Sequence, residues 1–172
     1  QLIKIIDGIP HLFVDYVQGM DVEKLTKKES LTIKSIIEIA IQCCGALDHA
    51  FRLSRACHGD LRPSHMIIGE DDILKIDNFA MARVFDLIPH AGSIREKCRQ
   101  IENNEISVKD FPAYESLPYM APELYDERHD MGSRSDIYAF GVILYKLLAG
   151  FNPFWGESPS KLLANHQSVI PV

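Results

Sequence analysis

Two short segments hold the residues whose types and spacing could do chemistry. Residues 58–65 read HGDLRPSH, and residues 75–83 read KIDNFAMAR. The first segment has a carboxylate at Asp60 and a guanidinium at Arg62, and a guanidinium can bind a planar anionic group through two hydrogen bonds. Mg²⁺ prefers oxygen ligands, usually with one or two carboxylates among them. His65 and Asn78 carry no carboxylate, and they offer only an imidazole nitrogen and an uncharged amide oxygen.

The two segments resemble the catalytic loop and the metal-binding loop of protein kinases, H-R-D-L-x-x-x-N and D-F-G. Asp60 stands at the Asp of the first motif. His65 and Asn78 stand where the family has its metal-binding Asn and Asp. An alternative register moves Asp77 into the metal role, but it would turn that side chain to the opposite face and displace Phe79 from the motif Phe.

Two downstream motifs favour this family over another one. Ala121-Pro122-Glu123 matches the A-P-E motif, and the segment from Asp136 to Gly141 resembles D-x-W-x-x-G with a tyrosine in third place. Aminoglycoside and choline phosphotransferases share the H-G-D form that Gly59 creates here, but they lack both downstream features. The resemblance therefore points to the protein-kinase branch.

The resemblance implies a role for each motif residue. Asp60 would be the catalytic base that accepts the proton of the substrate hydroxyl, and Arg62 would contact the transferred phosphoryl group. Ser116, at the usual Thr of the substrate loop, indicates Ser/Thr rather than Tyr ancestry. Structural roles are implied for His58, Phe79, Glu123 and Asp136, with the His58 ring packed beneath Phe79.

Four motif positions depart from the family pattern. His65 and Asn78 are degenerate metal positions, so the resemblance predicts impaired Mg²⁺ binding. A transition metal held by His58 with His65 is a much weaker alternative. Gly59 replaces the Arg that normally holds a phosphorylated activation segment, so we expect no such activation. Ala80 replaces the motif Gly and reduces backbone freedom.

The N-terminal part is expected to form the nucleotide-facing edge. The resemblance places the last small-lobe hairpin and hinge in residues 1–19, and an incomplete large lobe in residues 20–172. Val14 would be the gatekeeper. Nucleotide contacts are expected at Asp15, Val17, Asp21 and Ile67. ATP and Mg²⁺ would be the cofactors of an active protein, and an inactive one would need neither.

Local patterns predict the elements that must position these residues. Short apolar runs interrupted by a turn at Asp7–Pro10 predict a hairpin, and Met66–Ile68 with Ile73–Ile76 predicts another. A short helix is expected over Val22–Lys27. Ser30 is the expected cap of a long, mostly buried helix. The two runs of the first hairpin are Gln1–Ile6 and His11–Val17. The long helix is expected from Leu31 to about Leu53.

The second half of the chain is expected to be mainly helical. The activation segment would run from Asn78 to Glu123, and its charged middle, Ala91–Glu105, would be helical, with Asn103 and Asn104 ending the helix. Asp136–Ala149 is almost wholly apolar and predicts a central buried helix that ends at Gly150. Ser158 and Pro159 predict the start of a last helix, to about Ser168. The expected fold class is α+β.

Composition restricts the function classes. The 172 residues carry a net charge of −6, which argues against binding nucleic acid or an anionic membrane. No apolar run reaches the length of a membrane span, and Gln1 opens no signal peptide. The four cysteines lack C-x-x-C spacing, so reduced thiols and a cytoplasmic location are expected, with Cys43 and Cys44 as core filler.

Three functional hypotheses follow. The first is a pseudokinase, a kinase-like domain with impaired Mg-ATP binding that acts through a protein partner. The second is a Ser/Thr kinase lobe whose complete parent binds ATP and phosphorylates protein hydroxyls. The third is a helical interaction module that binds no nucleotide.

Overall fold

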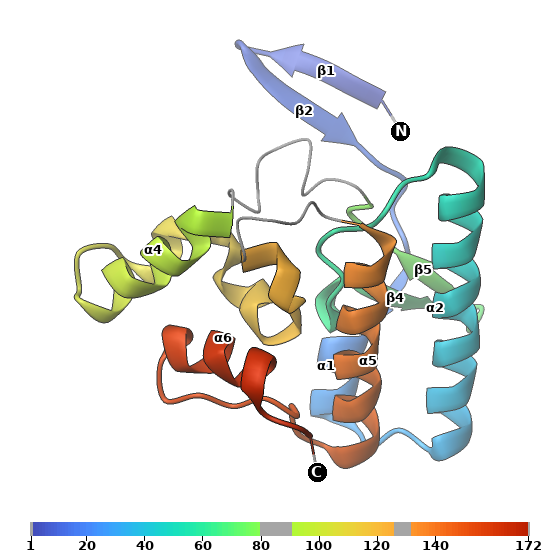
Figure 1. The fold of residues 1–172 in the computed structure, drawn as a ribbon. Helices are drawn as coiled ribbons and strands as arrows, with labels where there is room; N and C mark the ends of the chain where they lie inside the picture. Colours follow the sequence, from blue (N-terminus) through green and yellow to red (C-terminus); the bar gives the residue numbers. More distant parts are fainter. Residues whose placement is uncertain (1, 80–90, 126–131, 172) are drawn as a thin grey trace.

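The computed structural model describes residues 2–79, 91–125 and 132–171, and their fold is α+β as expected (Figure 1). The described residues form two small antiparallel sheets and a larger helical part, and the first two α-helices lie between the first two strands of the second sheet along the chain. The two termini lie on opposite sides of the view in Figure 1.

The first sheet is a hairpin of β1 (Leu2–Ile6) and β2 (Ile9–Phe13). Asp7 and Gly8 connect the strands with φ angles of 51° and 78°, the left-handed conformation that two-residue hairpin turns require. The predicted turn of four residues and the predicted strand end at Val17 are both wrong. Pro10 lies in β2 opposite Ile5. Figure 1 shows this hairpin at the top, apart from the helices.

The second sheet has the order β3-β4-β5 and carries the two motif loops. β4 (Met66–Gly69) and β5 (Leu74–Ile76) form the predicted hairpin. β3 (Gly19–Asp21) was not predicted, and it pairs with the edge of β4 opposite to β5. It begins at Gly19, so it extends across the expected boundary between the two lobes.

The long helix α2 spans Ile33–Ser54 and follows the short helix α1 (Val22–Lys28). The Thr32 side chain accepts a hydrogen bond from the Ser35 backbone N–H, so Thr32 and not Ser30 is the N-cap.

The expectation that α2 is mostly buried is wrong. Ile36, Ile39, Cys43 and Leu47 are buried on one face, whereas the Ile33 side chain is 70% exposed. Cys43 is core filler as predicted, but Cys44 is exposed because it lies one residue, about 100°, around the helix.

A matched pair of substitutions tests the cap assignment. Thr32→Ala should lower the free energy of unfolding by about 1 kcal/mol, because a backbone N–H of the first turn loses its acceptor. Ser30→Ala should change it by less than about 0.5 kcal/mol, as is usual for an exposed residue outside such a feature. Urea unfolding followed by circular dichroism measures both. A larger effect at Ser30 would show that Ser30 is the N-cap, as the sequence predicted.

The helix α5 (Ser133–Ala149) packs against α2 in the main core, as Figure 1 shows for the orange and teal helices. It starts three residues before the predicted Asp136, and it ends as predicted at Gly150, which has a φ of 82°. Its buried face includes Phe140 and Ile143, but Ile137 is 59% exposed, so the helix is not buried on all sides.

A second core lies between α4 (Ala91–Glu102), α6 (Pro159–Ser168) and a run of 3₁₀ turns. Ser158 caps α6 as predicted. The turns, which were not predicted, are η2 (Val108–Asp110), η3 (Pro112–Tyr119) and η4 (Pro122–Tyr125), and η1 (Pro63–His65) lies in the first motif loop. Within the described residues, no helix is both long and apolar enough to span a membrane.

Candidate functional site

The first motif loop is fixed by a buried carboxylate at the start of α5. Asp136 is 4% exposed, and its two oxygens accept hydrogen bonds from the backbone N–H groups of His58 and Gly59 at 2.7 and 2.8 Å. Gly59 has a φ of 83°, a conformation that favours glycine. The loop is therefore anchored by a residue 77 positions away in the sequence.

His58 connects the two motif loops. Its Nδ1 accepts from the Asp60 backbone N–H, so Nε2 carries the proton and donates to the Asp77 carbonyl at 2.8 Å. Its ring is fully buried and meets the Phe79 ring edge-on, with 5.1 Å between centroids. This is the packing of His58 beneath Phe79 that the resemblance implies.

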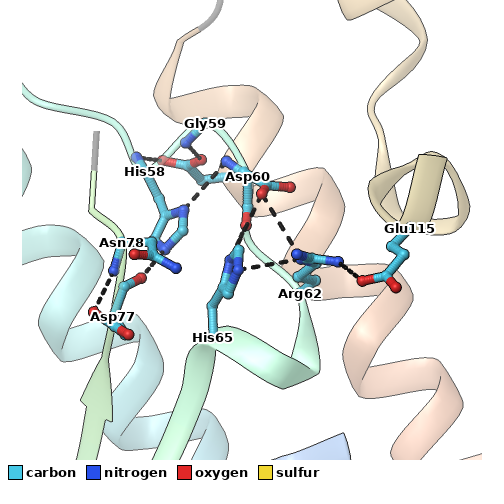
Figure 2. A network of polar contacts seen from close by, with 9 residues as sticks. His58, Gly59, Asp60, Arg62, His65, Asp77, Asn78 and Glu115 are labelled. Carbon is cyan, nitrogen blue, oxygen red and sulfur yellow. Dashed lines mark hydrogen bonds and ion pairs between the residues drawn. The ribbon is translucent and has the colours of Figure 1, made fainter. Parts of the chain in front are cut away.

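Asp60 lies between His58 and Arg62 with one carboxylate oxygen unused (Figure 2). Among the described residues, Oδ1 is buried and accepts no hydrogen bond. Oδ2 lies 3.7 Å from Arg62 Nε. Asp60 also lines a small cavity of about 10 Å³, together with Ser116 and Asp136. A buried carboxylate oxygen without a donor is costly, so Oδ1 is a polar atom that the contacts among the described residues leave unsatisfied.

His65 uses both of its ring nitrogens inside the loop. Arg62 Nε donates to Nε2 at 3.2 Å, so Nδ1 carries the proton and donates to the Asp60 carbonyl at 2.8 Å. The ring is 8% exposed. Neither nitrogen of His65 has a lone pair left for a metal ion.

Arg62 reaches an acidic side chain that no sequence motif marked. Its NH1 lies 2.6 Å from Glu115 Oε2, which comes from the 3₁₀ segment η3. Figure 2 shows Arg62 between this glutamate and the carboxylate of Asp60. The two residues are 53 positions apart. A contact at that separation leaves no periodic signal in the sequence.

Asn78 begins the second motif loop in the left-handed conformation, with a φ of 60°. Asn tolerates this region better than most residues. Its backbone N–H bonds to Asp77 Oδ1 at 2.7 Å, so one oxygen of Asp77 is already used. The packing of Phe79 against His58 favours the register in which Asn78, and not Asp77, stands at the metal position. Ala80 lies outside the described residues.

The motif positions do not fit Mg²⁺. Of the two side chains at the metal positions, His65 has no free lone pair and Asn78 has no charge. The weaker alternative of a transition metal on His58 and His65 also fails, because both rings are hydrogen-bonded through both nitrogens.

The expected nucleotide contacts lie on two adjacent segments. Asp15 and Val17 are in the stretch between β2 and β3, where Asp15 is exposed and Val17 is half-buried. Asp21 and Ile67 are directly opposite each other in the β3–β4 pair. The Asp21 carboxylate caps α1 through the Lys24 backbone N–H and forms an ion pair with the Lys24 side chain at 2.8 Å.

The remaining predicted positions lie beside α5. Ser116 is buried in η3 and is 5% exposed. Glu123, in η4, accepts a hydrogen bond from the Ser135 hydroxyl at 2.8 Å. This bond joins the A-P-E segment to the first turn of the helix whose Asp136 holds the catalytic loop.

Two buried histidines should make stability depend on pH. Burial lowers the pKa of His58 and that of His166 from 6.5 to about 4. Because the unfolded chain takes up these protons first, stability is complete above pH 6.5 and falls as the pH drops toward 4. Between pH 7 and pH 5, each histidine should lower the free energy of unfolding by about 2 kcal/mol.

Urea unfolding at the two pH values measures this loss. His166 is the better residue to replace, because its Nε2 has no hydrogen-bond partner among the described residues. The His166→Gln variant should lose roughly half as much stability as the wild type over the same interval. An equal loss in both proteins would contradict the assignment.

Comparison with known proteins identifies relatives for nearly the whole chain. Residues 7–170 match the family model described as protein kinase domain. A probable serine/threonine-protein kinase of Clostridium perfringens is 26% identical over 96% of this chain and 22% of its own length. Serine/threonine-protein kinase PknB of Mycobacterium tuberculosis is 26% identical, covering 95% of this chain and 24% of the relative. Serine/threonine-protein kinase A of a Synechocystis strain is 28% identical over 88% of this chain and 28% of its length. The chain thus spans about a quarter of the length of these relatives.

Proposed function

The chain belongs to the protein kinase family, and from that premise we propose that it is the large-lobe portion of a Ser/Thr-type pseudokinase. Such a domain keeps the kinase fold, binds Mg-ATP poorly or not at all, and acts through contacts with other proteins. The expected division into residues 1–19 and 20–172 is part of this proposal.

The observation that carries the proposal is the hydrogen bonding of His65. Phosphoryl transfer in this family depends on positioning and on neutralising charge with metal ions. His65 is held by Arg62 and by the Asp60 carbonyl, and it cannot turn toward a metal without breaking both bonds. Asn78 supplies no charge to compensate. The loop is therefore organised around contacts of its own side chains.

The scaffold of the site supports a retained binding surface. The buried Asp136 carboxylate, the His58 ring and the Glu123–Ser135 hydrogen bond all hold the loops in place. These groups fix the fold and take no part in holding a metal. A domain that has kept its scaffold while its metal positions have changed is suited to presenting a rigid surface to a protein partner.

A second candidate function rests on Asp60. Its unpaired Oδ1 and the neighbouring Ser116 are what a substrate hydroxyl would meet if the complete parent transferred phosphate to protein hydroxyls. In that case Asp15, Val17, Asp21 and Ile67 would contact ATP. The third hypothesis, a module that binds no nucleotide, differs from the pseudokinase in predicting no ATP effect on stability.

A phosphotransfer assay tests the proposal. The full-length protein that contains this chain would be incubated with radiolabelled ATP, Mg²⁺ and a mixed library of Ser/Thr peptides. We expect label incorporation equal to that of the Asp60→Asn variant. The reason is that the site would not bind Mg-ATP productively, so the proton-transfer step would not be reached. Incorporation that needs both Mg²⁺ and Asp60 would overturn the pseudokinase proposal in favour of the second candidate.

A further inference from the structure

The ion pair between Arg62 and Glu115 joins the catalytic loop to η3. Its short distance of 2.6 Å makes it the closest contact that Arg62 forms with either acidic side chain near it, since Asp60 Oδ2 is 3.7 Å away. The single positive charge of Arg62 therefore lies between two carboxylates. By formal count this group of three side chains is negative.

The two partners of the pair differ in how they are held. The Arg62 side chain is 18% exposed and is fixed from behind by the hydrogen bond to His65. The Glu115 side chain is 76% exposed. An ion pair with one solvent-exposed side chain contributes little free energy. Glu115 is therefore the partner that can move away while Arg62 stays in place.

We propose that Glu115 controls the binding of anions at Arg62, by engaging the guanidinium that a phosphate group would otherwise bind. Guanidinium groups bind phosphate and carboxylate with the same paired donor geometry, so the two anions compete for Arg62. While Glu115 accepts from Arg62 Nη1 and His65 accepts from Nε, an incoming phosphate meets two carboxylates beside a guanidinium that is already partly engaged.

The position of Glu115 makes this occupancy the ground state. Glu115 precedes the buried Ser116 within η3, a segment that packs against α5 and α6. The backbone is thus held next to the small cavity that Asp60 and Ser116 line, and the glutamate needs only its side-chain rotamers to reach Arg62. The inference rests on the proposed placement of Arg62 at the phosphoryl end of the cleft.

Pyrophosphate binding tests the proposal without nucleotide or metal. Isothermal titration calorimetry would measure the affinity of the full-length protein for inorganic pyrophosphate in a buffer with EDTA. Glu115→Gln should bind pyrophosphate about 5- to 10-fold more tightly than the wild type, because it removes a like charge beside the anion and frees the guanidinium. Glu157→Gln, the same change at an exposed loop position, should alter the affinity less than about twofold, since salt screens distant charges.

A double variant assigns the effect to Arg62. In an Arg62→Gln background, Glu115→Gln should give no gain, because the competing cation is gone. Equal affinity of wild type and Glu115→Gln, no detectable binding by Glu115→Gln, or the same gain without Arg62 would each overturn the proposal. These outcomes are independent of Mg²⁺, so they are distinguishable from a failure of the pseudokinase assignment, which depends on Mg-ATP.

Discussion

Asp136→Ala should lower the free energy of unfolding by about 4 kcal/mol, a larger loss than that expected for Thr32→Ala. The Asp136 carboxylate is the acceptor for two buried backbone N–H groups, those of His58 and Gly59. Each N–H left without an acceptor costs about 1–3 kcal/mol. The left-handed Gly59 would also lose the contact that holds it. Urea unfolding followed by circular dichroism measures the loss.

Two further variants separate this explanation from a general effect of removing an acid. Asp136→Asn keeps one acceptor oxygen, so it should cost about half as much stability as Asp136→Ala does. Asp48→Ala removes a carboxylate whose side chain is 56% exposed and pairs with Arg52 on α2, and it should cost less than about 1 kcal/mol. A loss below about 1 kcal/mol for Asp136→Ala would contradict the anchoring role of this residue.

The double substitution His65→Asn with Asn78→Asp should produce Mg²⁺-dependent ATP binding in the full-length protein. It removes the imidazole that is held by Arg62 and supplies a carboxylate at the second metal position. Asp tolerates the left-handed conformation of residue 78 almost as well as Asn does. We expect the affinity for ATP with Mg²⁺ to rise roughly 10- to 100-fold, a gain of about 1.4–2.7 kcal/mol.

The control for this variant adds the same charge elsewhere. Asn103→Asp, in the exposed turn after α4, should leave ATP affinity unchanged within about twofold. Calorimetric titration with and without Mg²⁺ gives both affinities. If the double variant gained nothing from Mg²⁺, positions 65 and 78 would not be the metal positions, and the register that uses Asp77 would have to be reconsidered.

Local sequence signals predicted the elements whose ends are set by nearby residues. Ser158 with Pro159 placed the start of α6 correctly, because a cap acts on N–H groups within the next turn. The β4–β5 hairpin was also predicted, since its two apolar runs flank a short polar turn. Local patterns failed at Ser30, because Thr32 offers an equally good cap two residues later.

Features that depend on distant residues could not be predicted. The strand β3 is three residues long and exists because Met20 pairs with Ile68, 48 positions along the chain. Cys44 was expected in the core together with Cys43, but which face of α2 is buried is decided by packing against α5. The substitutions at positions 65 and 78 were visible in the sequence, whereas the bonds that occupy His65 and the Glu115 partner of Arg62 needed the three-dimensional arrangement.

The most direct test of the pseudokinase proposal is thermal unfolding of the full-length protein with ATP alone and with ATP plus Mg²⁺. A ligand that binds only the folded state at a hundred times its dissociation constant adds about 2.7 kcal/mol, which corresponds to roughly 5–10 °C in Tm for a domain of this family's size. We predict a Tm that does not depend on Mg²⁺, whether or not ATP itself binds. A rise of several degrees that appears only when Mg²⁺ is added would show that the metal site works despite His65 and Asn78, and would contradict the proposal.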